Sequence, residues 1–242
     1  MKRSALLRLL GLLGLLCLPA AAAAAVHLEG AQTLRPLTVD LRRLYPKLEG
    51  RWRGIDASDY MRFGSGYRPA TIFLAAPDEG GEASAVTETA SAALPQAANG
   101  VFTLRRGEVD LQQRLLGASS ASALREHGLL RYPNAYPHTE ALYVADGASV
   151  QRYFLLSDPK APTRFTTAVR LRGGRLAEDP GRGLAVLDDS GAPAIRFAPP
   201  RVFDAEGHVR AANWTIHGGR RGRYTVEVGF DPTGLTYPLL VE

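Results

Sequence analysis

Four aromatic residues are the first candidates for chemistry in this chain. Tyr132 and Tyr136 each precede a proline in the stretch YPNAYP, Tyr143 follows in an alternating segment, and Trp214 lies further along. Trp and Tyr rings exposed on a β-sandwich can stack on sugars, so these residues form a candidate ligand-stacking surface. The alternative is that the rings pack in a core and that the Tyr hydroxyls bond at a corner of the fold.

Acidic residues offer a second kind of chemistry. The turns DDSG (188–191) and DAEG (204–207) each place carboxylates beside glycine, as calcium loops do. Each turn has only two carboxylates and lacks the alternating oxygen ligands and the late glutamate of a calcium loop. An Asp at the start of a turn is also explained by the hydrogen bonds that its carboxylate accepts from the nearby backbone. Hairpin turns are therefore the favoured interpretation.

Common catalytic motifs are absent from the sequence. There is no GxSxG, no HExxH, no P-loop and no GxGxxG before a helix. No two of the five histidines are two to five residues apart, although His208 and His217 could meet across a hairpin. A hydrolase would need dispersed residues, such as Asp188, Glu140 and His208, to meet only in the folded chain. We therefore expect no enzyme activity, no cofactor and no metal.

The N-terminus has the features of an export signal. A basic start leads into the apolar run LLGLLGLLCLP and then into the small residues Ala20 to Ala25. We predict a signal peptide over residues 1–25 and a mature chain from Val26, secreted, periplasmic or at the cell surface and without a stable membrane span. An uncleaved anchor is the alternative. Cys17 is the only cysteine, so the mature chain can form no internal disulfide and no thiolate metal site.

Charge gives little information about the partner. The whole chain has 29 Lys+Arg and 24 Asp+Glu, and three of the basic residues lie in the predicted signal. The mature chain then carries a small positive balance, spread along the sequence. Such a balance does not predict binding to nucleic acid or to an anionic membrane.

Strand and turn patterns predict the fold class. Short alternating segments such as VFTLRR, RFTTAVRLR and RYTVEVGF follow one another from Val101, separated by Gly- and Asp-rich turns. This pattern predicts an all-β fold, an antiparallel β-sandwich built of short hairpin-connected strands over residues 101–242. The main helical alternative is a short helix over Ser119 to Gly128.

The N-terminal region, residues 26–100, is less regular. LTVDLRRLYPKL predicts a short helix or strand, and TIFLAA (71–76) predicts a strand. Residues 76–100 are rich in small and polar residues, which is typical of a loop or flexible linker, with a strand near Ser84 to Thr89 as an alternative.

Proline positions predict where strands bend or end. A proline donates no hydrogen bond to a sheet, so YPNAYP is expected at an edge or a bend before EALYV begins. The same argument predicts an edge position for the last strand, in TYPLLVE, because of Pro238.

Several of these motifs also occur together in a known group of proteins. From GLLRYPNAYPHTEALYV through RVFDAEGHV to TYPLLVE, residues 100–242 resemble a β-sandwich region near the N-terminus of large bacterial secreted or surface proteins, including Rhs proteins with Tyr-Asp repeats. The matching positions are Tyr132, Pro133, Pro137, Glu140, Leu156, Pro159, Ala161, Pro162, Asp204, Ala205, Gly207, Tyr237, Pro238 and Val241. The chain departs from that pattern at Glu140, where Asp is usual, at Gln151-Arg152, where Lys-Glu is usual, and in having no repeats after Glu242.

This resemblance implies a non-catalytic extracellular module and supplies no catalytic residue. The expected function is thus a structural or interaction domain of a bacterial surface or secreted protein, either free-standing or the head of a larger repeat protein, with a protein or a glycan at the cell surface as partner. A carbohydrate-binding β-sandwich module is the alternative.

Overall fold

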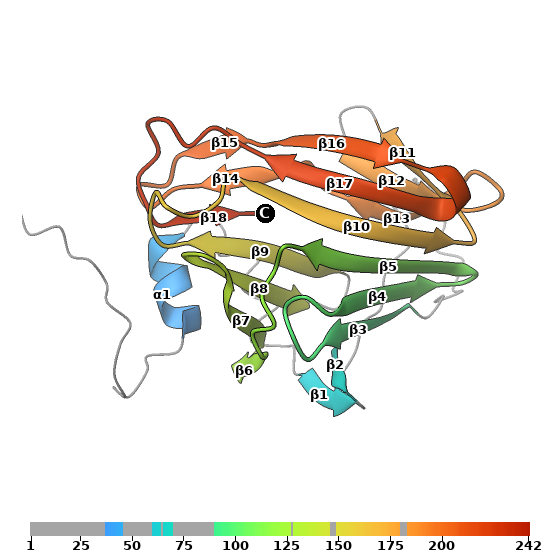
Figure 1. Ribbon diagram of the computed structural model, residues 1–242, viewed down its shortest axis with the longest axis horizontal. Coiled ribbons are helices and arrows are strands. Elements are labelled where there is room, and N and C mark those ends of the chain that lie inside the picture. Colours follow the sequence, from blue (N-terminus) through green and yellow to red (C-terminus); the bar gives the residue numbers. More distant parts are fainter. Residues whose placement is uncertain are drawn as a thin grey trace, which may run out of the picture. The chain divides into compact units, whose positions relative to one another are not determined.

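The computed structural model describes residues 37–45, 60–63, 65–69, 90–126, 128–145, 149–179 and 183–242. These residues form almost only β-strands, and every strand pairing among them is antiparallel, which confirms the predicted fold class (Figure 1). The predicted signal peptide, TIFLAA and Trp52 lie outside the described residues. The described part of the chain contains no helix with the length and apolar character needed to cross a membrane.

Two large sheets and one small sheet make up the fold. In spatial order, the eight-stranded sheet contains β1 (Tyr60–Phe63), β2 (Gly66–Pro69), β3 (Ser91–Pro95), β4 (Val101–Arg106), β5 (Val109–Leu116), β10 (Arg164–Arg172), β17 (Arg223–Gly229) and β16 (Asn213–Gly218). The seven-stranded sheet contains β15 (Val209–Ala211), β14 (Arg201–Phe203), β18 (Leu239–Val241), β9 (Val150–Leu156), β8 (Thr139–Ala145), β7 (Leu129–Tyr136) and β6 (Leu124–Glu126). The small sheet contains β11 (Arg175–Asp179), β12 (Gly183–Leu187) and β13 (Pro193–Phe197).

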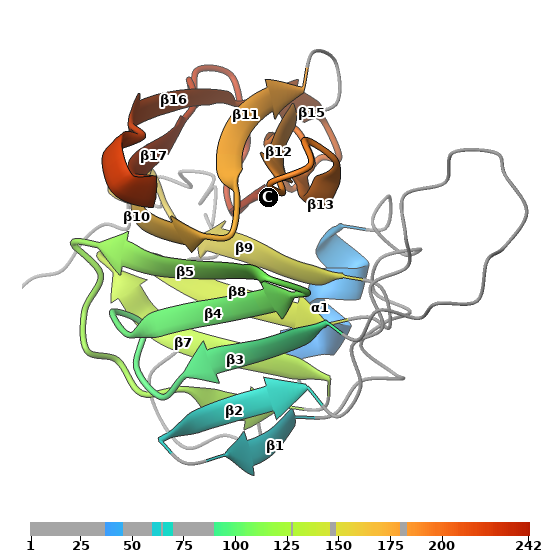
Figure 2. The same cartoon turned by 90° about the vertical axis from the view of Figure 1, so that its right-hand side faces the viewer.

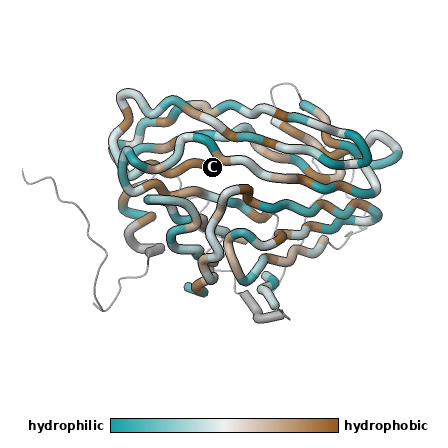
Figure 3. The backbone as a smooth tube through the Cα atoms, in the orientation of Figure 1, coloured by the Kyte–Doolittle hydropathy of each residue, from teal (hydrophilic) through white to brown (hydrophobic). Residues whose placement is uncertain are grey.

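The two large sheets face each other as the layers of a sandwich. Figure 2 shows β3, β4 and β5 forming one layer against β7, β8 and β9. Residues at alternate positions of β10, from Phe165 to Leu171, are buried, and hydrophobic and hydrophilic residues alternate along the strands in Figure 3. Because side chains on a strand project to opposite faces in turn, this alternation places one face of each sheet in the core.

Aromatic rings connect the two layers in the core. Phe154 of β9 stacks on Phe165 of β10, with ring centroids 4.0 Å apart, and Tyr136 meets both rings edge-on. Phe165 is 1% exposed. Burying one such side chain contributes about 1.5–3 kcal/mol, so these rings are a substantial part of what holds the layers together.

A helix covers part of the outer face of the seven-stranded sheet. LTVDLRRL forms the helix α1 (Leu37–Leu44), which settles the choice between helix and strand left open by the sequence. Leu41 of α1 and the following Tyr45 pack against Leu142, Val144 and other outward-facing residues of this sheet. The hydroxyl of Tyr45 donates a hydrogen bond to the carbonyl oxygen of Pro238 at 2.8 Å. Strand β8 is therefore buried on both faces.

Two segments differ from their predicted structures. Residues 91–95, placed in a predicted linker, form β3, because Ala92 and Leu94 alternate with more exposed residues and are buried in the core. The helix considered as an alternative over Ser119 to Gly128 does not form among the described residues of this segment. Ser122 instead forms a bridge with Ala97, and Leu124–Glu126 pairs with β7 as the short strand β6. In both places pairing with neighbouring strands overrides the local pattern, since β3 pairs with β2 and β4, and β6 pairs with β7.

The two proline motifs behave differently. The register between β7 and β8 shifts between Tyr132 and Tyr136, and Asn134 has a positive φ of 52°, so YPNAYP bends as predicted. The edge position predicted for the last strand is wrong, because β18 lies between β14 and β9. Pro238 stands just before β18, outside the hydrogen-bonded ladder, and its missing N–H is therefore not needed there.

Candidate ligand-binding cleft

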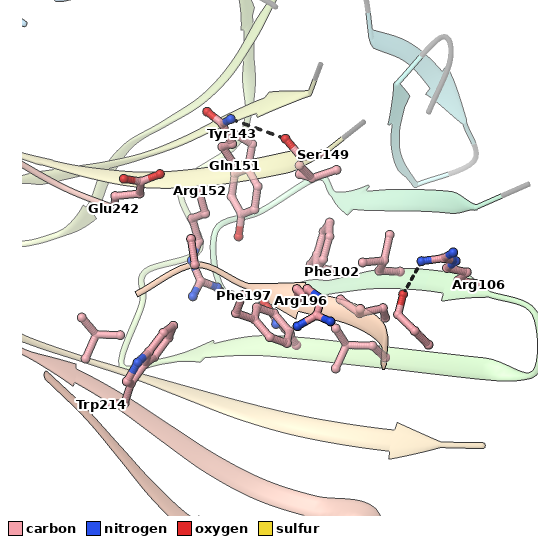
Figure 4. Close-up of a pocket in the computed structure, with 18 of the residues that line it drawn as sticks. Phe102, Arg106, Tyr143, Ser149, Gln151, Arg152, Arg196, Phe197, Trp214 and Glu242 are labelled. Atoms are coloured by element: carbon pink, nitrogen blue, oxygen red, sulfur yellow. Dashed lines mark hydrogen bonds between the residues drawn. The ribbon is translucent and has the colours of Figure 1, made fainter. Parts of the chain in front are cut away.

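A cavity of about 460 Å³ opens between the two large sheets beside the small sheet. Its walls come from β4 and β5 on one side, from β8 and β9 on the other, and from β13, with single residues of β16, β17 and β18 (Figure 4). This volume lies within the range of about 300–1,000 Å³ that is typical of small-molecule sites. We call this space the cleft. Its lining residues are Phe102, Leu104, Arg106, Leu111, Gln113, Tyr143, Ser149, Val150, Gln151, Arg152, Phe154, Pro193, Ala194, Ile195, Arg196, Phe197, Ala198, Trp214, Val228, Val241 and Glu242.

Two of the four predicted aromatic residues line the cleft. Trp214 comes from β16, is partly buried and packs against the core, and Tyr143 comes from the inner face of β8. The ring of Tyr143 stacks on Phe102 with a centroid distance of 5.9 Å. Phe197 of β13 adds a further ring. Trp214 and Phe197 are partly exposed, whereas Tyr143 and Phe102 are only 4% and 6% exposed, so the open aromatic surface of the cleft comes mainly from β16 and β13.

The other two predicted aromatic residues lie in the core instead. Tyr132 is 0% exposed and its hydroxyl donates to the carbonyl oxygen of Pro95 at 2.6 Å. Tyr136 donates in the same way to the carbonyl oxygen of Leu116 at 3.0 Å, and burial raises its pKa to about 12. Both contacts match the alternative of core packing with corner hydroxyl bonds. Neither residue lines the cleft.

Polar residues on the inner faces give the cleft its hydrogen-bonding groups. Arg152 projects from β9 and Gln113 from β5, and the guanidinium Nη1 donates to the amide Oε1 at 3.3 Å. Arg152 Nη2 donates to the hydroxyl of Thr167 at 3.4 Å, and the guanidinium lies 5.5 Å from the ring centre of Phe154. Arg152 thus crosses from one sheet to the other through the interior.

The sequence did not single out Arg152 or Gln113, although its pattern contains the signal. Arg152 shares the inward face of β9, VQRYFLL, with Val150, Phe154 and Leu156, and Gln113 alternates with buried leucines of β5 in the same way. A charged or amide residue on an otherwise apolar inward face is uncommon and marks a site where polar groups meet in the interior.

The residues of the hydrolase hypothesis lie in three different settings. Asp188 lies in the turn after β12 and accepts bonds from the backbone of that turn. Glu140 of β8 pairs with Arg131, and His208 contacts the carboxylate of Asp204. Asp188, Glu140 and His208 do not line the cleft. Across the described residues, no group of three acidic, His or Cys side chains is arranged to hold a metal ion.

The two acidic turns are hairpin turns. Asp204 is fully buried and its Oδ1 accepts hydrogen bonds from the backbone nitrogens of Glu206 and His208. Its Oδ2 accepts from the backbone nitrogen of Thr236 at 3.2 Å and contacts His208 Nδ1 at 3.0 Å. Burial works against the charge, but the bonds from His208 and Thr236 outweigh it and hold the pKa of Asp204 below its ordinary value.

Exposed arginines gather at one end of the eight-stranded sheet. Arg170 of β10 lies directly opposite Arg223 of β17, and Arg172 follows on β10. Arg220 and Arg221 belong to a short 3₁₀ turn that contacts β10. We call these five residues the basic end. The positive charge that is spread along the sequence is therefore concentrated by the fold.

Comparison with protein-family models, curated proteins and solved structures finds no match for this chain. The resemblance to the β-sandwich region of Rhs-containing surface proteins stays a prediction from the motifs quoted above.

Proposed function

We propose that this chain is a non-catalytic interaction domain of an exported bacterial surface or secreted protein, and that it binds its ligand in the cleft. The observation that carries this proposal is a cleft of about 460 Å³ lined by aromatic rings and crossed by a single interior arginine. Sites built on strands hold their side chains in fixed positions, which favours selective binding.

The lining of the cleft supports binding more than catalysis. It contains no histidine, aspartate or cysteine, and its one carboxylate side chain, Glu242, pairs with Arg201 at 2.9 Å. Nucleophilic and general acid–base catalysis both need a nucleophile or a proton donor within hydrogen-bonding reach of a matching group. The described lining offers Ser149 as a hydroxyl but no base beside it from these residue types.

A carbohydrate-binding module is the second candidate, and one observation favours it. Trp214 and Tyr143 line the same space, together with the side-chain amide of Gln113. Sugars bind by stacking their apolar face on an aromatic ring while their hydroxyls bond to amides and other polar groups.

The exported location is part of the proposal and rests on residues 1–25. Expression in a bacterial host with the full chain should release a product whose N-terminus lies near Val26. N-terminal sequencing of the periplasmic or secreted fraction would test it. A full-length product that stays with the membrane fraction would contradict it.

Binding is tested with residues 26–242 on an array of neutral and acidic glycans. We expect retention on at least one glycan class, and about two- to tenfold weaker binding in Trp214→Ala, since an aromatic contact contributes about 0.5–1.5 kcal/mol. Tyr132→Phe is the matched control, because it changes an aromatic hydroxyl in the core and leaves the cleft intact. Retention that Trp214→Ala leaves unchanged would contradict a site in the cleft.

A further inference from the structure

The interior position and the hydrogen bonds of Arg152 indicate which charge a ligand of the cleft carries. Its guanidinium is half-buried and its hydrogen-bond acceptors, Gln113 and Thr167, are both neutral. Their distances of 3.3 and 3.4 Å lie at the long end for N–H···O hydrogen bonds, so both contacts are weak. Two neutral acceptors use only part of the five N–H donors that a guanidinium carries.

Two of the other charged groups of the cleft have ionic partners, and the third, Arg106, donates from Nη1 to the carbonyl oxygen of Ala194 at 2.7 Å. Arg196 pairs with Asp179 of β11, and Glu242 pairs with Arg201 of β14. Among the described residues no carboxylate lies within ion-pair distance of Arg152. Arginine is rarely buried without a carboxylate or phosphate partner, because removing its charge from water is costly.

We propose that Arg152 is the anion-binding residue of the cleft and that the ligand is an acidic saccharide whose carboxylate pairs with the guanidinium. The inference rests on the proposed function, since it names the ligand class of the same cleft. Arginine presents a planar fork of N–H donors that matches the two oxygens of a carboxylate. The anion would supply the charge partner that the described residues around Arg152 do not.

The surroundings of Arg152 favour a sugar ring as the body of this anion. Phe197 and Trp214 provide partly exposed aromatic rings, and Gln113 places a side-chain amide directly against the guanidinium. A hydroxylated ring with a carboxylate can use all three kinds of group at once. A purely apolar acid would bring no hydroxyl to the amide nitrogen of Gln113, whose oxygen already accepts from Arg152.

The basic end is the main competing location for an anion. Its arginines are exposed, so their attraction is weak and is screened by salt over a distance of about 8–10 Å at physiological ionic strength. Arg152 lies between the sheets, where screening is weaker. Salt dependence and variants at each location therefore separate the two.

The experiment compares methyl β-D-glucuronide with methyl β-D-glucoside by calorimetric titration of residues 26–242. The two ligands differ mainly in the carboxylate, so the ratio of their affinities measures its contribution. We expect the acid to bind about ten- to one-hundredfold more tightly at 150 mM salt, as a charge-assisted pair in a partly buried site would give. Arg152→Gln should remove this preference, and Arg152→Lys should keep part of it.

Two control variants locate the effect. Arg196→Gln removes a cleft charge that is already paired with Asp179, and the double variant Arg170→Gln, Arg223→Gln removes two charges of the basic end. Both should keep the preference for the acid. Circular dichroism and the unfolding midpoint show that each variant is folded. If Arg152→Gln does not fold, the inference is tested by the ratio of the two sugar affinities, which should be high in the unaltered chain and reduced in Arg152→Lys.

The outcomes separate this inference from the proposed function. Equal binding of both sugars, weakened by Trp214→Ala, overturns the anion site and leaves binding in the cleft standing. A preference for the acid that persists in Arg152→Gln and is lost in the double variant of the basic end also overturns it. Failure of both sugars to bind overturns the inference, while the proposed function is then decided by its glycan-array test.

Discussion

Replacing Asp204 should destabilise the fold far more than replacing Asp188, although both residues begin a D-x-x-G turn. In each turn Oδ1 accepts hydrogen bonds from the backbone nitrogens two and four residues later. The local geometry is thus matched. The two turns differ in burial, because Asp204 is 0% exposed and Asp188 is partly exposed. They also differ in reach, because Oδ2 of Asp204 accepts a bond from Thr236, which leads into β18.

The size of the effect follows from these contacts. Asp204→Ala removes the acceptor for three backbone N–H groups and for the ring of His208. A hydrogen bond to a charged group contributes about 1.5–3 kcal/mol, and the more exposed of these donors can turn to water instead. We therefore expect a loss of about 3–5 kcal/mol in the free energy of unfolding for Asp204→Ala. Asp188→Ala should cost much less, because water replaces its carboxylate.

The same residue makes stability depend on pH. The folded-state pKa of Asp204 is lowered, since its hydrogen bonds outweigh the opposing effect of burial. Its contribution is therefore fully present above the unfolded pKa of about 3.9 and is lost as pH falls through that value towards the lower folded pKa. Asp204→Asn should show a smaller loss of stability between about pH 5 and pH 3 than the unaltered chain. Asp188 and Asp231, whose pKa values are also lowered, still contribute to the pH dependence of stability in this variant.

Urea unfolding followed by circular dichroism measures all three variants, at pH 7 and then from pH 6 to pH 3. Equal losses for Asp204→Ala and Asp188→Ala at pH 7 would refute the assignment of the long-range bond as the main difference. An unchanged pH profile in Asp204→Asn would refute the claim that this carboxylate is ionised and stabilising in the folded state.

Three further predictions concern the core and one turn. Phe165→Ala should cost about 3–5 kcal/mol in urea unfolding, because it leaves a cavity between the stacked layers, whereas Val101→Ala, at an exposed site, should change stability little. Tyr132→Phe should cost about 1 kcal/mol through its lost hydrogen bond, and a loss of sugar binding with stability intact would reverse its assignment to the core. Gly222→Ala should lower the thermal midpoint, since the added Cβ would lie 2.1 Å from a backbone oxygen of β10 at a φ of +68°; an unchanged midpoint would contradict this contact.

The comparison of the two acidic turns shows what sequence can and cannot predict here. DDSG and DAEG give the same local signal, and both form the predicted turn. The bond from Thr236 to Asp204 joins residues 32 positions apart, so no local pattern contains it. Contacts between distant residues are set by the folded chain as a whole. β3 was predicted as linker because its segment is rich in small residues, and its pairing with β2 and β4 is seen only in the folded chain.

The cleft shows the same division between local and long-range information. The period-two pattern of VQRYFLL contains the inward position of Arg152, which was not selected from the sequence, and its meeting with Gln113 depends on how two sheets face each other. Tyr143 and Trp214 were selected by residue type and do line the cleft, whereas Tyr132 and Tyr136 were selected by the same argument and lie in the core. Residue type alone does not distinguish a ring at a cavity from a ring that fills one.

Fluorescence of Trp214 provides the most direct test that the cleft is the ligand site. The chain contains two tryptophans, so a Trp52→Phe variant of residues 26–242 leaves Trp214 as the only one. Titration with methyl β-D-glucuronide should give a saturable change in its emission, at the same midpoint as the calorimetric titration. Calorimetric binding with no change in the emission of Trp214 would place the ligand elsewhere and contradict the account.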